Sequence, residues 1–169
     1  LTSLEEDKVS DLETSLVVDL GGTTLDCGAI AGRYKNVTQV SGEPGLGVTL
    51  VTTATMNALK QAGTHTSYYI ADQLVRNRNA DDLFEIVVND SSKIDDVKSV
   101  IENSITRLSD RVINHLHSYK GINRIYMTGG GAELIYPAIK KAFPLLKDKV
   151  KILPDAQLAL VISIAEINR

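Results

Sequence analysis

The chain has 169 residues, of which 43% are hydrophobic and 23% are charged, as expected for one soluble domain or for one half of a two-domain protein. The net charge of −3 argues against a domain that coats nucleic acid, and the single cysteine, Cys27, excludes an internal disulfide and a multi-cysteine zinc site. No apolar run reaches the about 18 residues of a membrane span, and the acidic start lacks the basic region of a signal peptide, so we expect a cytoplasmic protein without a membrane partner.

The N-terminal segment, residues 1–14, is acidic and only weakly apolar, which favours a connector or tail. The first residue is Leu1 rather than Met, so we expect a piece of a longer protein, with the folded domain over residues 15–169.

Three short strands are predicted next, and their close connections favour an antiparallel meander. Residues 16–18 form an apolar run, residues 21–22 are a Gly-Gly turn, and residues 24–31 alternate between apolar and polar side chains. Residues 34–40 would return as the third strand, and the Gly-Glu-Pro-Gly sequence at 42–45 is expected to break the pattern.

Two helices are predicted after the meander. Over residues 46–62 apolar side chains recur at a helical spacing, on the face that carries Leu46, Leu50, Ala54, Ala58 and Ala62. Residues 67–75 could form a second, shorter helix. Residues 76–92 are polar and have no regular pattern, so no element is predicted there.

The strongest helical pattern lies in the middle of the chain. Apolar residues there step by three and four positions, and they are Ile94, Val97, Ile101, Ile105, Leu108, Val112, Leu116 and Tyr119. Ser92 with Asp95 is typical of a capping box, and Gly121 gives a stop.

The last third of the chain alternates strands and helices. Strands are predicted over residues 122–127 and 150–153, and helices over residues 132–143 and 156–168. The last helix is apolar on nearly all its faces, so we expect it to pack against a second domain. The whole order predicts an α/β fold with a mixed sheet and helices on both of its faces.

Two segments carry residues suited to binding a phosphorylated ligand. The first comprises Asp19, Gly21, Gly22, Thr23, Thr24 and Asp26. Glycines let backbone amides approach phosphate oxygens, hydroxyls add donors, and carboxylates are hard ligands for hydrated Mg²⁺. A tight β-hairpin without a ligand is an equally good interpretation of this segment alone.

The second segment is Gly129, Gly130 and Gly131, between a predicted strand and a predicted helix. A helix N-terminus offers free amides to an anion, and the glycines permit close approach. An ordinary strand-to-helix loop is the alternative, because the segment lacks the lysine of a P-loop and the spacing of a dinucleotide fingerprint.

Together these segments resemble the superfamily of actin, heat-shock chaperones and sugar kinases. Within it, the resemblance is to the ParM (StbA) family of bacterial actin-like plasmid-segregation ATPases, and it spans most of residues 15–168. It rests on residues 16–26 (LVVDLGGTTLD), 45–52 (GLGVTLVT) and 129–135 (GGGAELI).

The resemblance implies an actin-like subdomain with a ribonuclease-H-like core, the C-terminal half of a protein that holds ATP or ADP with Mg²⁺ between two halves. It implies that Asp19 organises the metal ion, with Asp26 as a further carboxylate. It also implies that residues 21–24 surround the β- and γ-phosphates and residues 129–131 the α-phosphate and adenosine. Asp72 and Arg76 lie where relatives contact ribose and base, although a solvated helix face is their more common role.

The function implied for the intact protein is an ATPase that assembles with itself into filaments and captures plasmid DNA through a DNA-binding adaptor protein. The first phosphate loop and the carboxylate that polarises water would belong to the N-terminal half, so we expect this chain alone to hydrolyse little or no ATP. Half of a sugar or acid kinase and a non-catalytic actin-family scaffold are the alternatives.

Overall fold

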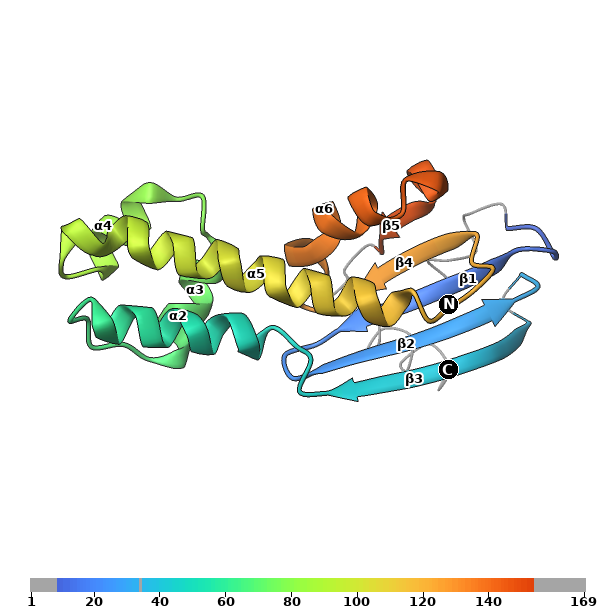
Figure 1. The fold of residues 1–169 in the computed structure, drawn as a ribbon, viewed down its shortest axis with the longest axis horizontal. Helices are drawn as coiled ribbons and strands as arrows, with labels where there is room; N and C mark the ends of the chain where they lie inside the picture. The colour runs from blue at the N-terminus through green and yellow to red at the C-terminus, as the bar shows by residue number, and fades with distance from the viewer. Residues whose placement is uncertain (1–8, 34, 154–169) are drawn as a thin grey trace, which may run out of the picture.

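The computed structural model describes residues 9–33 and 35–153. Five strands form one mixed sheet in the order β3-β2-β1-β4-β5 (Figure 1). They are β1 (Thr14–Leu20), β2 (Thr24–Ala31), β3 (Asn36–Pro44), β4 (Arg124–Thr128) and β5 (Val150–Ile152). The first three strands are antiparallel neighbours, whereas β4 lies parallel to β1 and to β5. The predicted meander and the predicted late parallel strands are therefore confirmed.

The described helices include one that joins the two ends of the elongated molecule. They are α2 (Thr49–Gln61), α3 (Tyr68–Arg76), α4 (Asp81–Val87), α5 (Ile94–Leu116) and α6 (Ala132–Ala142). With 23 residues α5 is about 35 Å long. Its first half runs beside α2 in a helical region, and its second half lies against the sheet (Figure 1).

The core lies between the sheet and the helices α5 and α6. Alternate residues of β1, namely Leu16, Val18 and Leu20, are fully buried there, because successive side chains of a strand point to opposite faces. The predicted stripe of α5 is buried from Val97 to Leu116 and packs into the same cluster. The other face of β1 carries Asp19, so the sheet places the core and the carboxylate on opposite sides.

Several predicted boundaries differ from the structure. Strand β3 continues through Pro44, which pairs with Thr24 instead of breaking the pattern, because an edge strand does not need the missing amide of proline. A helix absent from the prediction, α4, occupies residues 81–87. The predicted helix over residues 156–168 lies outside the described residues.

Two details of the predicted helices were wrong. The buried face of α2 carries Val51, Thr52, Thr55, Ala58 and Leu59, whereas Leu50 is 40% exposed. The capping box at the start of α5 does not form: a short 3₁₀ turn precedes the helix, and Asp90 accepts a hydrogen bond from the Ser92 amide there. In the part of the chain that the structure describes, no helix is long and apolar enough to cross a bilayer.

Candidate functional site

The two predicted carboxylates meet at the carboxyl end of β1. Asp19 pairs across the antiparallel ladder with Asp26 of β2 and across the parallel ladder with Thr128 of β4. Residues that are directly opposite in a sheet point to the same face, so these three side chains form one row across three strands. The row lies on the face opposite the hydrophobic core.

The electrostatics of this row favour a bound cation. Burial raises the pKa of the Asp19 carboxyl above its usual value, and the charge of Asp26 raises it further. The neighbouring Cys27 is buried toward the core, and burial together with the two carboxylates raises the pKa of its thiol to about 12. Two like charges held side by side destabilise each other, and a divalent cation would remove that cost.

The hairpin between β1 and β2 presents free backbone amides. It is closed by the Gly21 amide, which donates to the Thr24 carbonyl at 2.9 Å. The amides of Gly22 and Thr23 have no acceptor among the described residues, and both residues are exposed. Unpaired amides in a glycine-rich turn form a concave anion-binding surface, which is the arrangement predicted for a phosphate.

The N-terminus of α2 fixes the hairpin from behind. The Val48 amide donates to the Gly21 carbonyl, and the amide and hydroxyl of Thr49 both donate to the Gly22 carbonyl, at 2.7 and 2.6 Å. Gly47 lies so close that a Cβ atom there would be 2.5 Å from the Gly22 carbonyl oxygen. Side chains at position 47 are therefore excluded, and the hairpin carbonyls are held away from the exposed amides.

The second glycine segment lies directly against the first. The Gly131 amide donates to the Leu20 carbonyl at 2.9 Å, which ties the loop after β4 to the end of β1. A Cβ atom at Gly129, whose φ is +83°, would be 2.2 Å from the Asp19 carboxylate oxygen. The Gly130 amide has no acceptor among the described residues. The structure thus brings together both glycine segments and Asp19.

Two further predicted residues lie elsewhere. Asp72 and Arg76 form an ion pair with each other at 2.7 Å on α3. No hydrogen bond or ion pair of the described residues links either side chain to the glycine segments. The nearest connection runs through Tyr68 at the start of α3, whose hydroxyl lies 3.4 Å from the Thr49 hydroxyl.

Three residues of the site had no predicted role. Gly47 and Thr49 fix the hairpin, and Thr128 completes the row of Asp19 and Asp26. The sequence signal for the first two was their place in the segment 45–52, which carries the family resemblance. No sequence pattern pointed to Thr128, because only the pairing of β4 with β1 places it beside Asp19.

The donor set fits a hydrated Mg²⁺ better than a metal held by protein alone. Among the described residues, no group of three or more histidine, cysteine and acidic side chains could hold a metal ion. Mg²⁺ commonly takes one or two carboxylates and completes its shell with water and phosphate oxygens. Asp19 and Asp26 supply such a pair, and the free amides beside them suit the phosphates.

Comparison with known proteins relates the chain to plasmid segregation protein ParM and to the actin-like fold. The family described as plasmid segregation protein ParM, C-terminal, matches residues 9–167. No curated protein matches the sequence. Among solved structures, a ParM filament from Clostridium botulinum has a TM-score of 0.74 and 15% identity, and the match covers 98% of this chain and 48% of that one.

Other solved structures share the fold to a similar degree. The archaeal actin homologue Ta0583 in complex with ADP has a TM-score of 0.68 and 16% identity, over 94% of this chain and 50% of that one. The PilM–PilN type IV pilus biogenesis complex contains a match with a TM-score of 0.67 and 13% identity, over 98% of this chain and 48% of that one. The chain therefore spans about half the length of the solved structures that it matches, and the predicted actin-like α/β fold is confirmed.

Proposed function

This chain belongs to the family of plasmid segregation protein ParM, and we propose that it is the nucleotide-binding half of an actin-like ATPase that forms filaments and segregates plasmid DNA. The proposed ligand is ATP or ADP with Mg²⁺, bound between this half and an N-terminal half. The proposed site of action is the cytoplasm, and plasmid DNA would be reached through a DNA-binding adaptor protein.

The observation that carries the proposal is the junction of the two glycine segments at Asp19. Free amides of Gly22, Thr23 and Gly130 surround the end of β1, where Asp19 and Asp26 lie on one face. Nucleotide phosphates with a divalent ion present the charges that these amides and carboxylates complement.

Each part of the site has a role in this proposal. The amides of Gly22 and Thr23 would hold the β- and γ-phosphates, with the hydroxyls of Thr23 and Thr24 beside them, and the loop of residues 129–131 would hold the α-phosphate and adenosine. Asp19 and Asp26 would hold Mg²⁺ and its waters. The bound ion would neutralise charge on the phosphates during hydrolysis. Asp72 and Arg76 would contact ribose and base only after giving up part of their mutual ion pair.

Hydrolysis by this half alone should be slight. Phosphoryl transfer depends on positioning and on charge stabilisation around the whole phosphate chain, and this chain offers one side of such a site. We expect no turnover above the buffer control from the isolated chain. ATP turnover by the isolated chain that disappears in Asp19→Ala would show that this half hydrolyses ATP without the other half.

The first experiment follows assembly of the full-length protein that contains this chain. Light scattering after addition of ATP and Mg²⁺ should rise and then decay, and Asp19→Ala should lose the decay or the assembly. Asp110→Ala is a matched control, because Asp110 is exposed on α5 and forms no ion pair with any described residue. Loss of the signal in both variants would mean that Asp19 has no special role.

The same experiment separates the alternatives. A kinase half would bind adenine nucleotide without assembling and would transfer phosphate to a small molecule. A non-catalytic scaffold would show neither ATP turnover nor nucleotide-dependent assembly. Absence of assembly at all protein concentrations would therefore refute the proposed function and lead to a screen of phosphoryl acceptors.

A further inference from the structure

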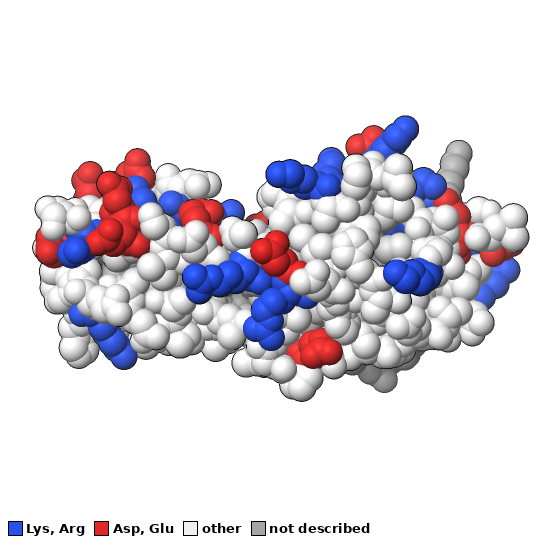
Figure 2. Space-filling view, in the orientation of Figure 1, with Lys and Arg blue, Asp and Glu red and all other residues white. Residues whose placement is uncertain are grey.

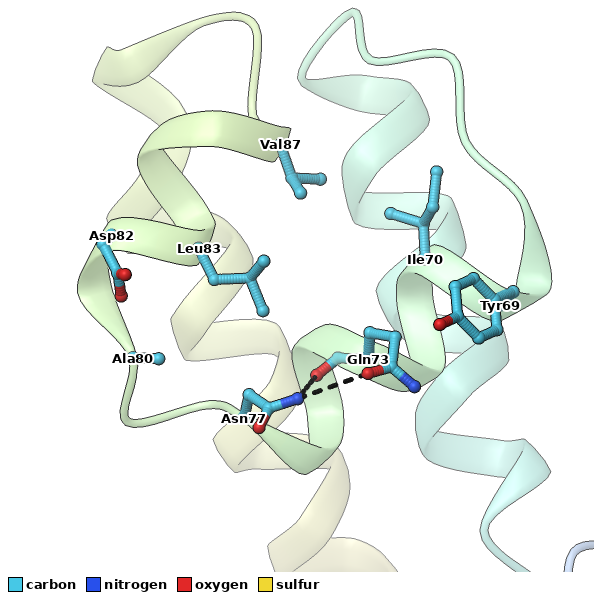
Figure 3. Close-up of a pocket in the computed structure, with 8 residues that line it drawn as sticks. All are labelled: Tyr69, Ile70, Gln73, Asn77, Ala80, Asp82, Leu83 and Val87. Atoms are coloured by element: carbon cyan, nitrogen blue, oxygen red, sulfur yellow. Dashed lines mark hydrogen bonds between the residues drawn. The ribbon is translucent and has the colours of Figure 1, made fainter.

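An apolar groove lies between α3 and α4, at the end of the molecule away from the sheet. Its volume is about 500 Å³, and Tyr69 and Ile70 of α3 face Leu83 and Val87 of α4 across it (Figure 3). Gln73 and Asn77, which are hydrogen-bonded to each other, lie along one side. Tyr69 is 68% exposed, and Ile70, Leu83 and Val87 are half-buried. The helical end of the chain thus presents an open apolar surface.

The rim of the groove carries uncompensated negative charge. Asp82 lines the groove, and Glu85 is exposed one turn later on the same short helix. Neither carboxylate forms an ion pair with a described residue, whereas the adjacent Asp81 is paired with Lys98. Acidic side chains gather over this end of the molecule (Figure 2). A partner for the groove should therefore combine an apolar side chain with positive charge.

The chain itself presents such a feature after α6. Leu145 is 93% exposed on the 3₁₀ segment Pro144–Lys149, while the next residue, Leu146, packs against the core. Phe143 contacts the ring of His117 with centroids 5.1 Å apart and accepts a hydrogen bond from the Leu146 amide. The turn therefore holds the Leu145 side chain in solvent, because Phe143 before it and Leu146 after it are both packed.

Exposed lysines precede and follow Leu145 in the chain. Lys141 and Lys147 are exposed and form no ion pair with any residue that the structure describes, and Lys140 is only 4.0 Å from Asp148, the limit of an ion pair. Basic side chains gather over α6 (Figure 2), far from the acidic end that carries α4 (Figure 1). We call Leu145 with Lys141 and Lys147 the basic knob.

We propose that the groove between α3 and α4 of one copy receives the basic knob of the next copy. The two surfaces are different and lie far apart on one chain, so the contact is heterologous, and a contact that does not close produces a filament. Charge complementarity between Asp82 and Glu85 on one copy and the lysines on the other selects a second copy as the occupant. This inference rests on the proposed function, because it assigns residues to the filament contact.

The test uses two variants of the full-length protein that each remove one surface. Leu145→Gln removes the apolar knob, and the double variant Asp82→Lys with Glu85→Lys reverses the charge of the groove. Each should raise the critical concentration for assembly with ATP and Mg²⁺ at least tenfold. Leu12→Gln and Asp110→Lys are matched controls, since Leu12 is 94% exposed outside both surfaces, and neither control should change assembly.

Mixing the two variants gives a sharper result. One intact groove and one intact knob remain in the mixture, so sedimentation should detect a one-to-one pair that neither variant forms alone. Binding of a fluorescent ATP analogue should equal that of the wild-type protein in both variants, because both surfaces lie away from the glycine segments.

The outcomes separate this contact from the proposed function. Assembly of either variant like the wild type, absence of the pair in the mixture, or equal loss in the controls would overturn the contact and leave the filament proposal standing. Failure of the wild-type protein to assemble with any nucleotide would overturn both.

Discussion

The most direct test of the site geometry is Gly129→Ala. At this position a side chain meets two separate obstacles, a positive φ of +83° and the end of β1. The new Cβ atom would lie 2.2 Å from the Asp19 carboxylate oxygen and 2.5 Å from the Leu20 carbonyl oxygen. The first atom belongs to a side chain that can rotate, but the second is backbone within the central strand of the sheet, so the loop itself has to move.

The magnitude follows from two terms. A positive φ costs a residue with a side chain about 1–2 kcal/mol, and forcing extra volume into a packed region costs about 1–3 kcal/mol. Gly129→Ala should therefore lower the free energy of unfolding by about 2–5 kcal/mol. It should also weaken nucleotide binding, because the displacement moves Asp19 and the Gly130 amide away from each other.

Alanine substitutions at two other glycines separate the cost of the positive φ from the cost of the added volume. Gly121 has a φ of +70° and open space around its Cβ position, so Gly121→Ala carries only the first cost. Gly28, inside β2, has open space and no positive φ, so Gly28→Ala should leave stability unchanged or raise it by up to about 1 kcal/mol. Urea unfolding of the three variants measures the differences. The reasoning fails if Gly129→Ala is no less stable than Gly121→Ala.

Three titratable groups give further predictions. Burial first, and then the charge of Asp26, raise the pKa of Asp19, so the ionised carboxylate opposes folding. The variant Asp19→Asn should therefore melt at a higher temperature than the wild type at pH 7. This gain in melting temperature should vanish as the pH falls through the raised pKa toward 3.8. Hydrogen bonds from Lys149 first, and then from the Ser10 amide and Arg124, lower the pKa of Glu13 to about 2. The variant Glu13→Gln should therefore be less stable than the wild type at neutral pH. In melting experiments at different pH, this difference in stability should close between pH 4.5 and about 2. Burial first raises the pKa of Cys27 to about 12, so a disulfide reagent at pH 8 should label it only after urea unfolds the chain, and rapid labelling of the folded chain would contradict its burial.

Most of the site could be predicted from sequence because it is built from contiguous segments. Residues 16–26 form a strand, a turn and a second strand, and their order in the chain is enough to place Asp19 opposite Asp26. The segment 125–131 similarly places its glycines after a buried strand. No local pattern predicts that β4 pairs with β1, because more than a hundred residues separate the two strands. The register of Asp19 with Thr128 is a result of that long-range pairing.

The errors in the helices have a common physical origin. Apolar spacing assigned Leu50 to the buried face of α2, yet Thr52 and Thr55 are buried there instead. Their hydroxyls donate to the carbonyls of Val48 and Val51 one turn earlier, so the polar atoms are satisfied within the helix and the methyl groups are free to pack. A pattern based on polarity alone assigns such threonines to solvent.

The helix α4 was missed because it is short. Leu83, Phe84, Val87 and Val88 follow a helical spacing and face the core, but they span little more than one turn of a seven-residue helix, and Ile86 outside that stripe is 79% exposed. Asp81 and Asp82 at its first turn are favourable for the helix dipole, but such a signal is weak beside so short a period. Leu83 and Val87 of this short stripe line the proposed docking groove, whereas Ile86 does not.

The N-terminus of α2 shows why the location of the anion site could not be deduced from helix positions alone. A helix that begins beside a glycine hairpin is the usual place to expect a phosphate, because its first amides lack partners. Here the Val48 and Thr49 amides donate to the hairpin carbonyls of Gly21 and Gly22. The helix therefore holds the backbone of the hairpin, and the amides left for an anion are those of Gly22 and Thr23 on the hairpin itself. The variant Thr49→Val removes the hydroxyl and keeps the amide. It should weaken nucleotide binding, because the hairpin is held less firmly, while α2 stays folded. Unchanged binding together with an unchanged melting temperature would show that the Thr49 amide alone fixes the turn.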